Sequence, residues 1–466
     1  MRKAKPQLVY PYIPNSVPAV KAAMLAATGA ASVEEFYADV PADLRLDRPM
    51  NLPEPIHSEA RLKRHVQGIL ARNQHCGEVL SFLGGGCYQH HVPSICDEIN
   101  GRSEFLTAYA GEPYDDHGRF QALWEYCSMM GELLNLEVVS VPTYDGMQAA
   151  ATACCMAART TGRRRVLLAG NTSADKRSHI QTYGRSEIEF IEVAFDPVSG
   201  LLDRADLRAK LNDQVAALYL DVPNYFGGIE EGGAIAALVK SVGAMLVVGV
   251  DPLSLGVLTP PADYGADIVC GDIQPLGMHM SYGGGHGGFI ASRDEGALVL
   301  QYPSRLFGLA PTSVPGQYGF GDVAYHRTSF DKREQGNEFV GTAAALWGIT
   351  AGVFLACQGP QGMQELGDGI MKRVAYARQQ LGAVPGLRLM HPHTVHFKEF
   401  VLDFSPSGKT VSEINAALRE RGIFGGHDLS GAFPALGQAA LYAFTEVHAQ
   451  ADIDALVTAL REVLSQ

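Results

Sequence analysis

The chain has 466 residues, of which 47% are hydrophobic and 19% charged, and its formal net charge is −13. This composition is too apolar for a disordered chain, and the length suffices for a large domain and a smaller one. The acidic balance argues against nucleic acid or an anionic membrane as the main partner, because both prefer a basic face. No apolar run reaches the roughly 18 residues of a membrane-spanning helix, so we expect no membrane span.

The first residues are basic but no apolar stretch follows them, so no signal peptide is expected. The eight cysteines contain no C-x-x-C pair, which favours reduced thiols in the cytoplasm over a zinc site. His391, His393 and His396 have a spacing that suits a metal, but no set of paired carboxylates accompanies them. We therefore predict solvated or capping histidines there and no metal site.

Pro-rich joints separate short amphipathic runs in the first part of the chain, up to about residue 75. Residues 58–70 carry Leu62, Val66 and Leu70 at four-residue spacing, which predicts a helix with one apolar face. The pattern indicates an arm wrapped on something larger and not a domain with its own core.

From about 118 to 325, short apolar runs alternate with helical patterns. Strands are predicted at 165–169, 189–193, 216–220, 245–250 and 268–270, and helices at 119–134, 146–158, 204–211 and 234–242. This alternation indicates βαβ crossovers and a mainly parallel sheet covered on both faces.

From about 345 the pattern is that of an α+β lobe. Its predicted helices are 343–358, 363–381, 411–421 and 450–464, and its strands are 387–390, 399–403 and 441–444.

Three segments have the character of ligand sites, because in open α/β sheets ligands bind at the carboxyl ends of strands. The turn at 143–149 opens a helix at Asp145 and either holds a phosphate or is an ordinary N-cap. Asp251 ends a buried apolar run, and its carboxylate either pairs with the protonated ring nitrogen of a cofactor such as pyridoxal phosphate or caps a turn. The glycine-rich segments 282–288 and 84–86 either let the backbone approach a ligand or another subunit, or form flexible loops.

Short motifs along nearly the whole chain carry a specific resemblance. They are YIPN at 12–15, SFLG at 81–84, RSEF at 102–105, TAY at 107–109, YDG at 144–146, PNYFG at 223–227, DPLSLG at 251–256, GADIV at 265–269, QPLG at 274–277, GGHDL at 425–429 and TE at 445–446. Taken in order, they resemble subunit 1 (the alpha subunit) of the decarboxylating glycine dehydrogenase of the glycine cleavage system.

The resemblance implies an α/β fold like that of fold-type I transferases that depend on pyridoxal phosphate (PLP). Such a fold has a large domain with a mainly parallel sheet and a smaller α+β C-terminal domain. The expected domains are an N-terminal arm and helical segment at 1–115, a large α/β domain at 116–335 and the α+β domain at 336–466.

The positions of the lysines bear on the cofactor. A fold-type I enzyme carries its Schiff-base lysine soon after the strand that ends in the ring-pairing Asp, and no lysine lies between Asp251 and Lys332. Where the family's catalytic subunit has a His-Lys pair, this chain has Gln274 and Pro275, and neither offers the primary amine that a Schiff base needs. We therefore expect no catalytic residue in this chain. The resemblance implies that a lysine-bearing beta subunit holds PLP in an α2β2 assembly, with the active site at the α/β junction.

The implied activity belongs to the assembly, whose substrate is a small amino acid. Glycine loses its carboxylate as CO2 while PLP withdraws the electrons, and the aminomethyl group passes to the lipoyl arm of the H-protein. This chain is expected to form part of the cavity wall, exclude water and shape the channel for that arm. Asp251 is expected to be a relic of the cofactor site that now caps the fold. The candidate interface or cavity residues are Gly84, Gly85, Tyr109, Tyr144, Asp145, Asp251 and His286.

Three segments depart from the family's motifs, namely 112–118, 171–175 and 333–341, where cofactor or substrate neighbours are expected. The additional carboxylates there are Asp115, Asp116 and Glu338. Two alternatives therefore stand beside the glycine reading. One is a divergent paralogue that acts with a partner subunit on another amino acid or amine. The other is a non-catalytic scaffold homodimer, which the loss of the lysine alone permits.

Overall fold

The computed structural model describes residues 9–10, 12–46, 48, 50–106, 117–324, 338, 340 and 343–465. The chain divides into two units, residues 1–73 and residues 74–466. The domain boundaries expected at 115/116 and 335/336 fall outside the described residues, so both remain predictions.

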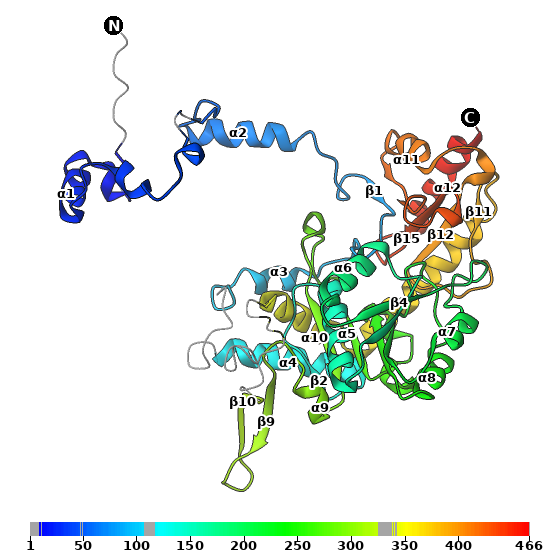
Figure 1. Ribbon diagram of the computed structural model, residues 1–466. Coiled ribbons are helices and arrows are strands. Elements are labelled where there is room, and N and C mark those ends of the chain that lie inside the picture. Colours follow the sequence, from blue (N-terminus) through cyan, green and yellow to red (C-terminus); the bar gives the residue numbers. More distant parts are fainter. Residues whose placement is uncertain are drawn as a thin grey trace. The chain divides into compact units, whose positions relative to one another are not determined.

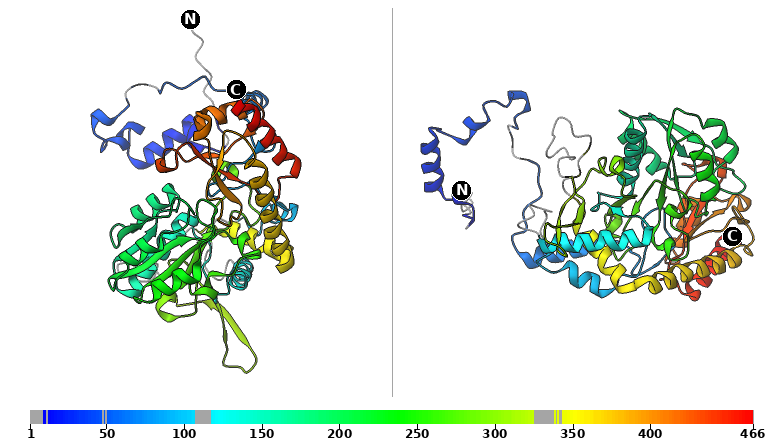
Figure 2. Two further views of the ribbon diagram at one scale, coloured as in Figure 1. Left: turned by 90° about the vertical axis from the view of Figure 1, so that its right-hand side faces the viewer. Right: turned by 90° about the horizontal axis from the view of Figure 1, so that it is seen from below.

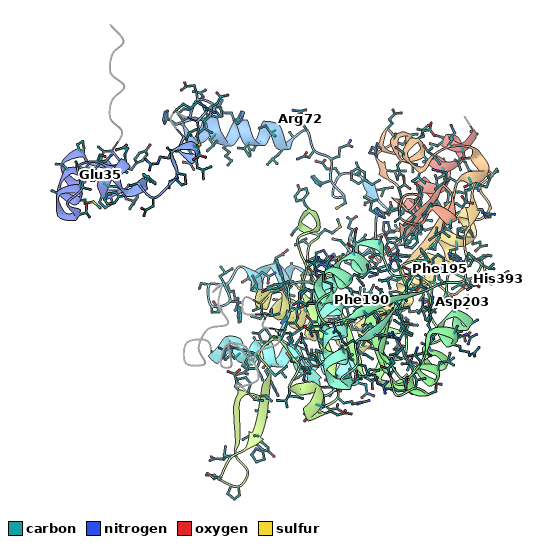
Figure 3. All side chains as sticks on the ribbon, in the orientation of Figure 1. Glu35, Arg72, Phe190, Phe195, Asp203 and His393 are labelled. Atoms are coloured by element: carbon teal, nitrogen blue, oxygen red, sulfur yellow. The ribbon has the colours of Figure 1, made fainter. Side chains whose placement is uncertain are left out.

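The first unit is a string of short helices without a core of its own (Figure 1). Its elements are η1 (Pro14–Ser16), α1 (Pro18–Thr28), η2 (Val33–Tyr37), η3 (Ala42–Leu44) and α2 (Glu59–Leu70). None of its described residues is buried. Figure 3 shows side chains projecting on all sides of this unit's ribbon, Glu35 and Arg72 among them.

Helix α2 confirms the helix expected at 58–70. It begins at a capping serine, because the Ser58 Oγ accepts a hydrogen bond from the backbone N–H of Arg61. Its apolar stripe is solvent-exposed in the isolated chain. The members of that stripe are Leu62, Val66, Ile69 and Leu70. A stripe of this kind has nothing within its own unit to pack against.

A seven-stranded sheet forms the centre of the second unit (Figure 1). In spatial order its strands are β2 (Val138–Val139), β8 (Gly288–Ser292), β7 (Ile268–Asp272), β6 (Met245–Val250), β5 (Val215–Asp221), β3 (Arg165–Ala169) and β4 (Glu189–Val193). The strands β3 to β7 run parallel, whereas β8 is antiparallel to both of its neighbours. The mainly parallel sheet is confirmed, and β3, β4 and β6 have the predicted bounds.

Helices cover both faces of this sheet, because alternate residues of its strands enter two separate cores. On β5, Ala217 and Tyr219 face one core and Leu218 and Leu220 face the other. The first core is closed by the Ala-rich helix α5 (Gly146–Thr161), whose small side chains let it pack against five strands of the sheet. The other helices of this part are α3 (Ser94–Asn100), α4 (His117–Leu134), α6 (Ala174–Gly184), α7 (Arg204–Lys210), α8 (Gly232–Lys240) and α9 (Gly296–Val299).

Several elements of this region were not predicted, among them helix α6 and a hairpin. Helix α6 buries only Ile180 and Gly184, so its sequence carries no apolar periodicity. The hairpin of β9 (Phe307–Pro311) and β10 (Tyr318–Asp322) is largely exposed, and its strands lack the buried alternation that marks a strand in a sequence.

The C-terminal lobe begins with the long helix α10 (Ala345–Leu381), which was expected as two helices. It kinks at Gly359, whose φ of 60° is followed by Pro360, and this pair explains the break in the sequence pattern. A four-stranded antiparallel sheet follows; Figure 2 shows this lobe in gold to red. Its strands in spatial order are β11 (Arg388–Leu389), β12 (Glu399–Asp403), β15 (Ala439–Ala443) and β14 (His427–Asp428), flanked by helices α11 (Val411–Arg419) and α12 (Gln450–Ser465).

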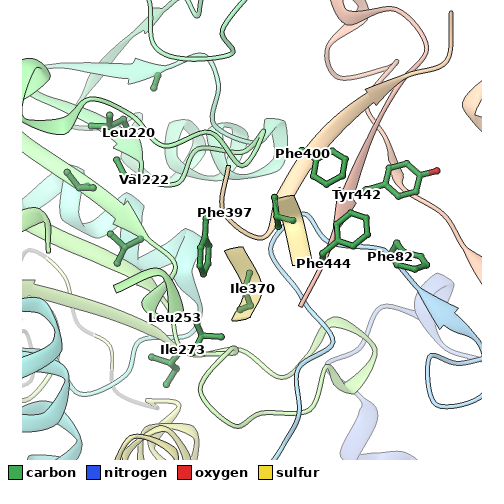
Figure 4. Close-up of a cluster of buried hydrophobic side chains, with 14 of the residues drawn as sticks. Phe82, Leu220, Val222, Leu253, Ile273, Ile370, Phe397, Phe400, Tyr442 and Phe444 are labelled. Atoms are coloured by element: carbon green, nitrogen blue, oxygen red, sulfur yellow. The ribbon is translucent and has the colours of Figure 1, made fainter. Parts of the chain in front are cut away.

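One continuous core joins the large sheet to this lobe (Figure 4). Phe397 is buried between the strand ends of the sheet and the aromatic rings of the lobe, where Phe400 and Phe444 stack with their centroids 5.1 Å apart. The backbone N–H of Phe397 donates to the carbonyl of Gly227, and a Cβ at Gly227 would lie 1.8 Å from the carbonyl oxygen of Glu399. This close approach fixes residues 397–399 against the carboxyl end of the sheet. A short pairing of β1 (Leu80–Ser81) with β13 (Ile423–Phe424) holds the start of the second unit to the lobe.

The histidines near the start of β12 differ in part from the prediction. His393 is exposed, but His391 and His396 are only 2% and 3% exposed, so the expectation of solvated side chains is wrong for these two. Their Nδ1 atoms contact the carbonyls of Val198 and Thr394, and burial lowers the pKa of His396 to about 3. Among the described residues, no group of three metal-ligating side chains is placed to hold an ion. No helix of the described chain is both long enough and apolar enough to cross a bilayer.

Candidate functional site

A cavity of about 390 Å³ lies at the carboxyl ends of β5, β6 and β7. This is the edge at which ligands bind in open α/β sheets. Other segments of its wall come from distant parts of the sequence: the loop at 85–88, the start of α5, the start of α6, residues 223–225, the glycine-rich segment at 283–286 and residues 397–399.

The start of α5 faces this cavity, and its backbone N–H groups are already bonded to carboxylates. The Oδ1 of Asp145 accepts hydrogen bonds from the N–H groups of Met147 and Gln148, each at 2.8 Å, so Asp145 is an N-cap. The N–H of Gly146 donates to Oδ2 of Asp272 at 2.8 Å. A helix N-terminus attracts a phosphate through such free N–H groups. Here a phosphate would find the donors occupied and would meet two carboxylates.

Asp251 follows β6 and is also occupied. Its Oδ1 accepts a hydrogen bond from the N–H of Leu253 at 3.0 Å, which starts the short helix η4 (Pro252–Gly256). Its Oδ2 forms an ion pair with the ammonium of Lys398. The expectation that Asp251 caps the fold agrees with this geometry. A protonated cofactor ring nitrogen would have to compete with the ammonium group for the carboxylate.

Lys398 lies in the core of the molecule, with 1% of its surface exposed. Its Nζ is 3.0 Å from Nε2 of His90 and 4.2 Å from the ring centroid of Tyr88. His90 in turn contacts Glu446 through Nδ1 at 2.8 Å. The ammonium group is therefore surrounded by a carboxylate, an imidazole and an aromatic ring.

A second lysine reaches the cavity from α6. The Nζ of Lys176 lies 2.8 Å from Oδ1 of Asp221 at the end of β5, and the hydroxyl of Tyr219 donates to the same oxygen. Burial by itself lowers the pKa of Lys176, but the charge of Asp221 outweighs it and raises the pKa above the ordinary value. The amine is therefore protonated at neutral pH, whereas forming a Schiff base requires a neutral amine.

Gln274 follows β7 and has a structural role. Its side chain is fully buried, and its Nε2 donates to the carbonyls of Tyr88 and Met278 at 2.9 and 3.2 Å. Its Oε1 accepts from the N–H of Tyr88 at 3.1 Å. The amide thereby ties the 85–88 loop to the large sheet, and Pro275 beside it lines the cavity.

Glu399 closes the cavity on the side of the C-terminal lobe. Its two oxygens accept hydrogen bonds from the N–H of Gly85 at 2.7 Å and from the hydroxyl of Tyr88 at 2.8 Å. Burial raises the pKa of Glu399 to about 7, against the lowering effect of these hydrogen bonds and of nearby Lys398.

This raised pKa predicts a pH-dependent stability that the Glu399→Gln variant lacks. Between pH 4.5 and 7 the folded chain binds a proton at Glu399 that the unfolded chain has lost, so the free energy of unfolding falls as the pH rises through this window. Urea unfolding at a series of pH values should show the wild type losing up to about 3 kcal/mol relative to the variant, with a constant difference above pH 7. A difference that does not change with pH would contradict the assignment.

The predicted site residues separate into three groups. Gly85, Asp145, Asp251 and His286 line the cavity, and a Cβ at Gly84 would lie 2.2 Å from the carboxylate of Glu399. Tyr144 is half exposed and does not line the cavity. Tyr109 lies outside the described residues, as do Asp115 and Asp116. The cavity residues that the sequence did not single out include Lys176, Asp221, Asp272, Lys398 and Glu399.

The departing segments that the structure describes are engaged in the fold. Glu338 is hydrogen-bonded by Thr152 and by the hydroxyl of Tyr183, and it lies 3.3 Å from Nη1 of Arg159. It therefore links α5 to α6 and does not line the cavity. Asn171 is buried and donates to a buried carboxylate.

Comparison with known proteins identifies the family of this chain. The family described as "Glycine cleavage system P-protein" matches residues 11–460. The chain belongs to the glycine cleavage system P-protein family. It is 36% identical to the probable glycine dehydrogenase (decarboxylating) subunit 1 of Staphylothermus marinus, covering 98% of this chain and 99% of that protein. A protein of the same name from Pyrococcus furiosus is also 36% identical, covering 97% and 99%.

Solved structures agree with the family and the fold. A crystal structure of glycine decarboxylase (P-protein) in inhibitor-bound form has a TM-score of 0.84 and 33% identity, covering 98% of this chain and 100% of that one. The sphingosine-1-phosphate lyase of Burkholderia pseudomallei shares the fold, with a TM-score of 0.66 and 16% identity. The predicted fold-type I PLP-transferase architecture is thus confirmed, and the chain is of the subunit 1 type of the P-protein enzyme.

P-proteins are PLP-dependent, but the cavity of this chain does not fit PLP. The cofactor needs donors for its phosphate, a carboxylate for its ring nitrogen and a neutral lysine amine for its aldehyde. In this cavity the N–H groups of α5 bind Asp145 and Asp272, and Asp251 binds Lys398. Lys176, the second amine, is held protonated by its aspartate. In each of the three cases, another group of the chain already occupies the group that PLP would need.

Proposed function

We propose that this chain is the subunit that does not anchor PLP in a glycine decarboxylase built from two kinds of subunit. A partner subunit holds PLP through its own lysine, CO2 leaves glycine, and the aminomethyl group passes to the lipoyl arm of the H-protein. The observation that carries the proposal is the internal pairing of the Gly146 N–H, Lys176 and Asp251, groups that would otherwise be available to the cofactor. The name "subunit 1" of the relatives supports a separate subunit 2. We expect the assembly in the cytoplasm.

The role proposed for this chain is to complete a site that the partner begins. The exposed tip of the glycine-rich segment suits contact with another subunit, since Tyr282 is 91% exposed and has a positive φ of 55°. Tyr144, which precedes the cavity residue Asp145 in the chain, is half-exposed. In this proposal the ion pairs of the cavity leave the cofactor with the partner subunit.

Reconstitution tests the proposal. The chain, a subunit 2, PLP and lipoylated H-protein are combined with carboxyl-labelled glycine, and release of labelled CO2 is measured. Each subunit alone should be inactive, and the mixture should gain roughly 1,000-fold or more in rate, because decarboxylation needs the electron sink that only one subunit anchors. Turnover by this chain alone with PLP would refute the proposal.

The same assay separates glycine from other substrates. Replacing glycine with other small amino acids or amines should give no turnover. Activity that prefers one of them, or that ignores the H-protein, would support the paralogue reading instead. A homodimer that never binds a subunit 2 would support the scaffold reading.

A further inference from the structure

The charges on the wall of the cavity do not balance. Among the residues that the structure describes, five carboxylates line it against three cationic side chains. Three of the carboxylates are each paired with one of the cations: Asp221 with Lys176, Asp251 with Lys398 and Asp272 with His286. The imidazole of His286 is charged at neutral pH, because its hydrogen bond with Asp272 raises its pKa to about 10. Asp145 and Glu399 are the two carboxylates that remain.

The two remaining carboxylates have only neutral hydrogen-bond donors within the described part of the chain. Asp145 accepts from two backbone N–H groups of α5, both on its Oδ1. Glu399 accepts from the N–H of Gly85 and the hydroxyl of Tyr88. It is 5% exposed, and burial raises its pKa to about 7, as is typical of a carboxylate that has lost its hydration. A cation that enters the cavity would supply the charge that these two groups lack.

The size and the lining of the cavity favour an organic cation over a metal ion. Its volume of about 390 Å³ lies in the range of sites for small organic molecules. In the described residues, no three metal-ligating side chains are grouped so that they could hold an ion. The aromatic rings of Tyr88, Tyr225 and Phe397 line the cavity and offer apolar contact to a short carbon chain. An anion, in contrast, would be repelled by the excess of carboxylates.

We propose that this cavity binds a small organic cation, a short aliphatic diamine, with Asp145 and Glu399 as its counter-ions. The ammonium groups of the ligand donate charge-assisted hydrogen bonds to the two carboxylates, and its carbon chain packs on the aromatic rings. Binding is non-covalent and leaves the three ion pairs of the wall in place. The inference concerns the cavity of this chain alone and does not rest on the proposed function.

Isothermal titration calorimetry of the purified full-length chain tests the proposal with three four-carbon ligands of equal length. The titrations are made at about pH 8, where Glu399 is ionised and a diamine is still a dication. Putrescine, the diamine, should bind at one site per chain with a dissociation constant below about 1 mM. The neutral diol and the dianion succinate should each bind at least roughly ten-fold more weakly. A diol or succinate that binds as tightly as putrescine would overturn the proposal, and so would putrescine binding that does not saturate at one site.

Two matched variants separate the cavity from the general acidity of the chain. Asp145→Asn removes one charge from the wall while its amide oxygen can still cap α5, and it should weaken putrescine binding about ten-fold. Asp203→Asn is the control, because Asp203 caps α7 through the same pair of backbone hydrogen bonds but does not line the cavity. This control should leave the dissociation constant unchanged. Equal constants in the two variants would overturn the proposal, and the comparison of the three ligands on the wild type decides it even where a variant fails to fold.

Discussion

Replacing Lys398 with Met is expected to lower the free energy of unfolding by about 3 kcal/mol. The ammonium group of Lys398 is buried against Asp251, so its removal leaves the carboxylate without a counter-ion. Tyr88 and His90 surround the ammonium, and burial lowers the pKa of His90. Urea unfolding of the purified chain measures the effect.

Two further variants make this result specific. Lys372→Met is the matched control: it removes a lysine from an exposed pair with Asp368 one helical turn away, which is worth less than about 0.5 kcal/mol. The double variant Lys398→Met/Asp251→Asn should recover most of the loss, because it removes both charges of the buried pair. If Lys398→Met and Lys372→Met unfold alike, the buried pair does not hold this cavity together.

Deletion of residues 1–73 is expected to weaken assembly with a subunit 2 strongly while leaving the rest of the chain folded. The described part of this unit has no buried residue, whereas all four hydrophobic cores are built from residue 82 onward. The exposed apolar side chains of this unit, including the stripe on α2, indicate a protein partner. The dissociation constant, measured by mass photometry or sedimentation, should rise at least ~100-fold, which corresponds to about 2.7 kcal/mol.

Point variants on α2 refine the test of the arm. Val66→Asp places a charge in the apolar stripe and should weaken assembly strongly, while Arg64→Gln on the opposite side of the helix should change it little. An intact complex from residues 74–466 would show that the arm has another purpose. Loss of the unfolding transition in that truncated chain would show that the arm is needed for folding.

The strands of the large sheet could be predicted because each is a short apolar run between turn residues. Both β4 and β6 were placed at their observed bounds in this way. The same runs placed Asp145 and Asp251 at the carboxyl edge of the sheet, where the cavity lies. Sequence position along a parallel sheet is therefore enough to find the cavity, since the ends of successive strands meet at one edge.

The partners of those carboxylates could not be predicted. Lys398 meets Asp251 only because the C-terminal lobe packs on the sheet through Phe397, and no local pattern around Lys398 marks it as buried. Lys176 lies on a helix with little apolar periodicity, so nothing in the sequence indicates that its side chain points toward Asp221. The sequence-based expectation considered only lysines that follow Asp251 closely in the chain. It therefore did not consider Lys176 and Lys398, which the tertiary fold brings to the cavity from distant positions.

The central claim is that this chain does not hold PLP, and reduction with borohydride tests it most directly. The purified chain is equilibrated with PLP, reduced to trap any imine, and digested for peptide mass spectrometry. We expect no pyridoxyl group on Lys176 or Lys398 and no absorbance band of a bound imine, whereas a subunit 2 should be labelled fully at one lysine under the same conditions. A stoichiometric pyridoxyl group on either of these two lysines would contradict it.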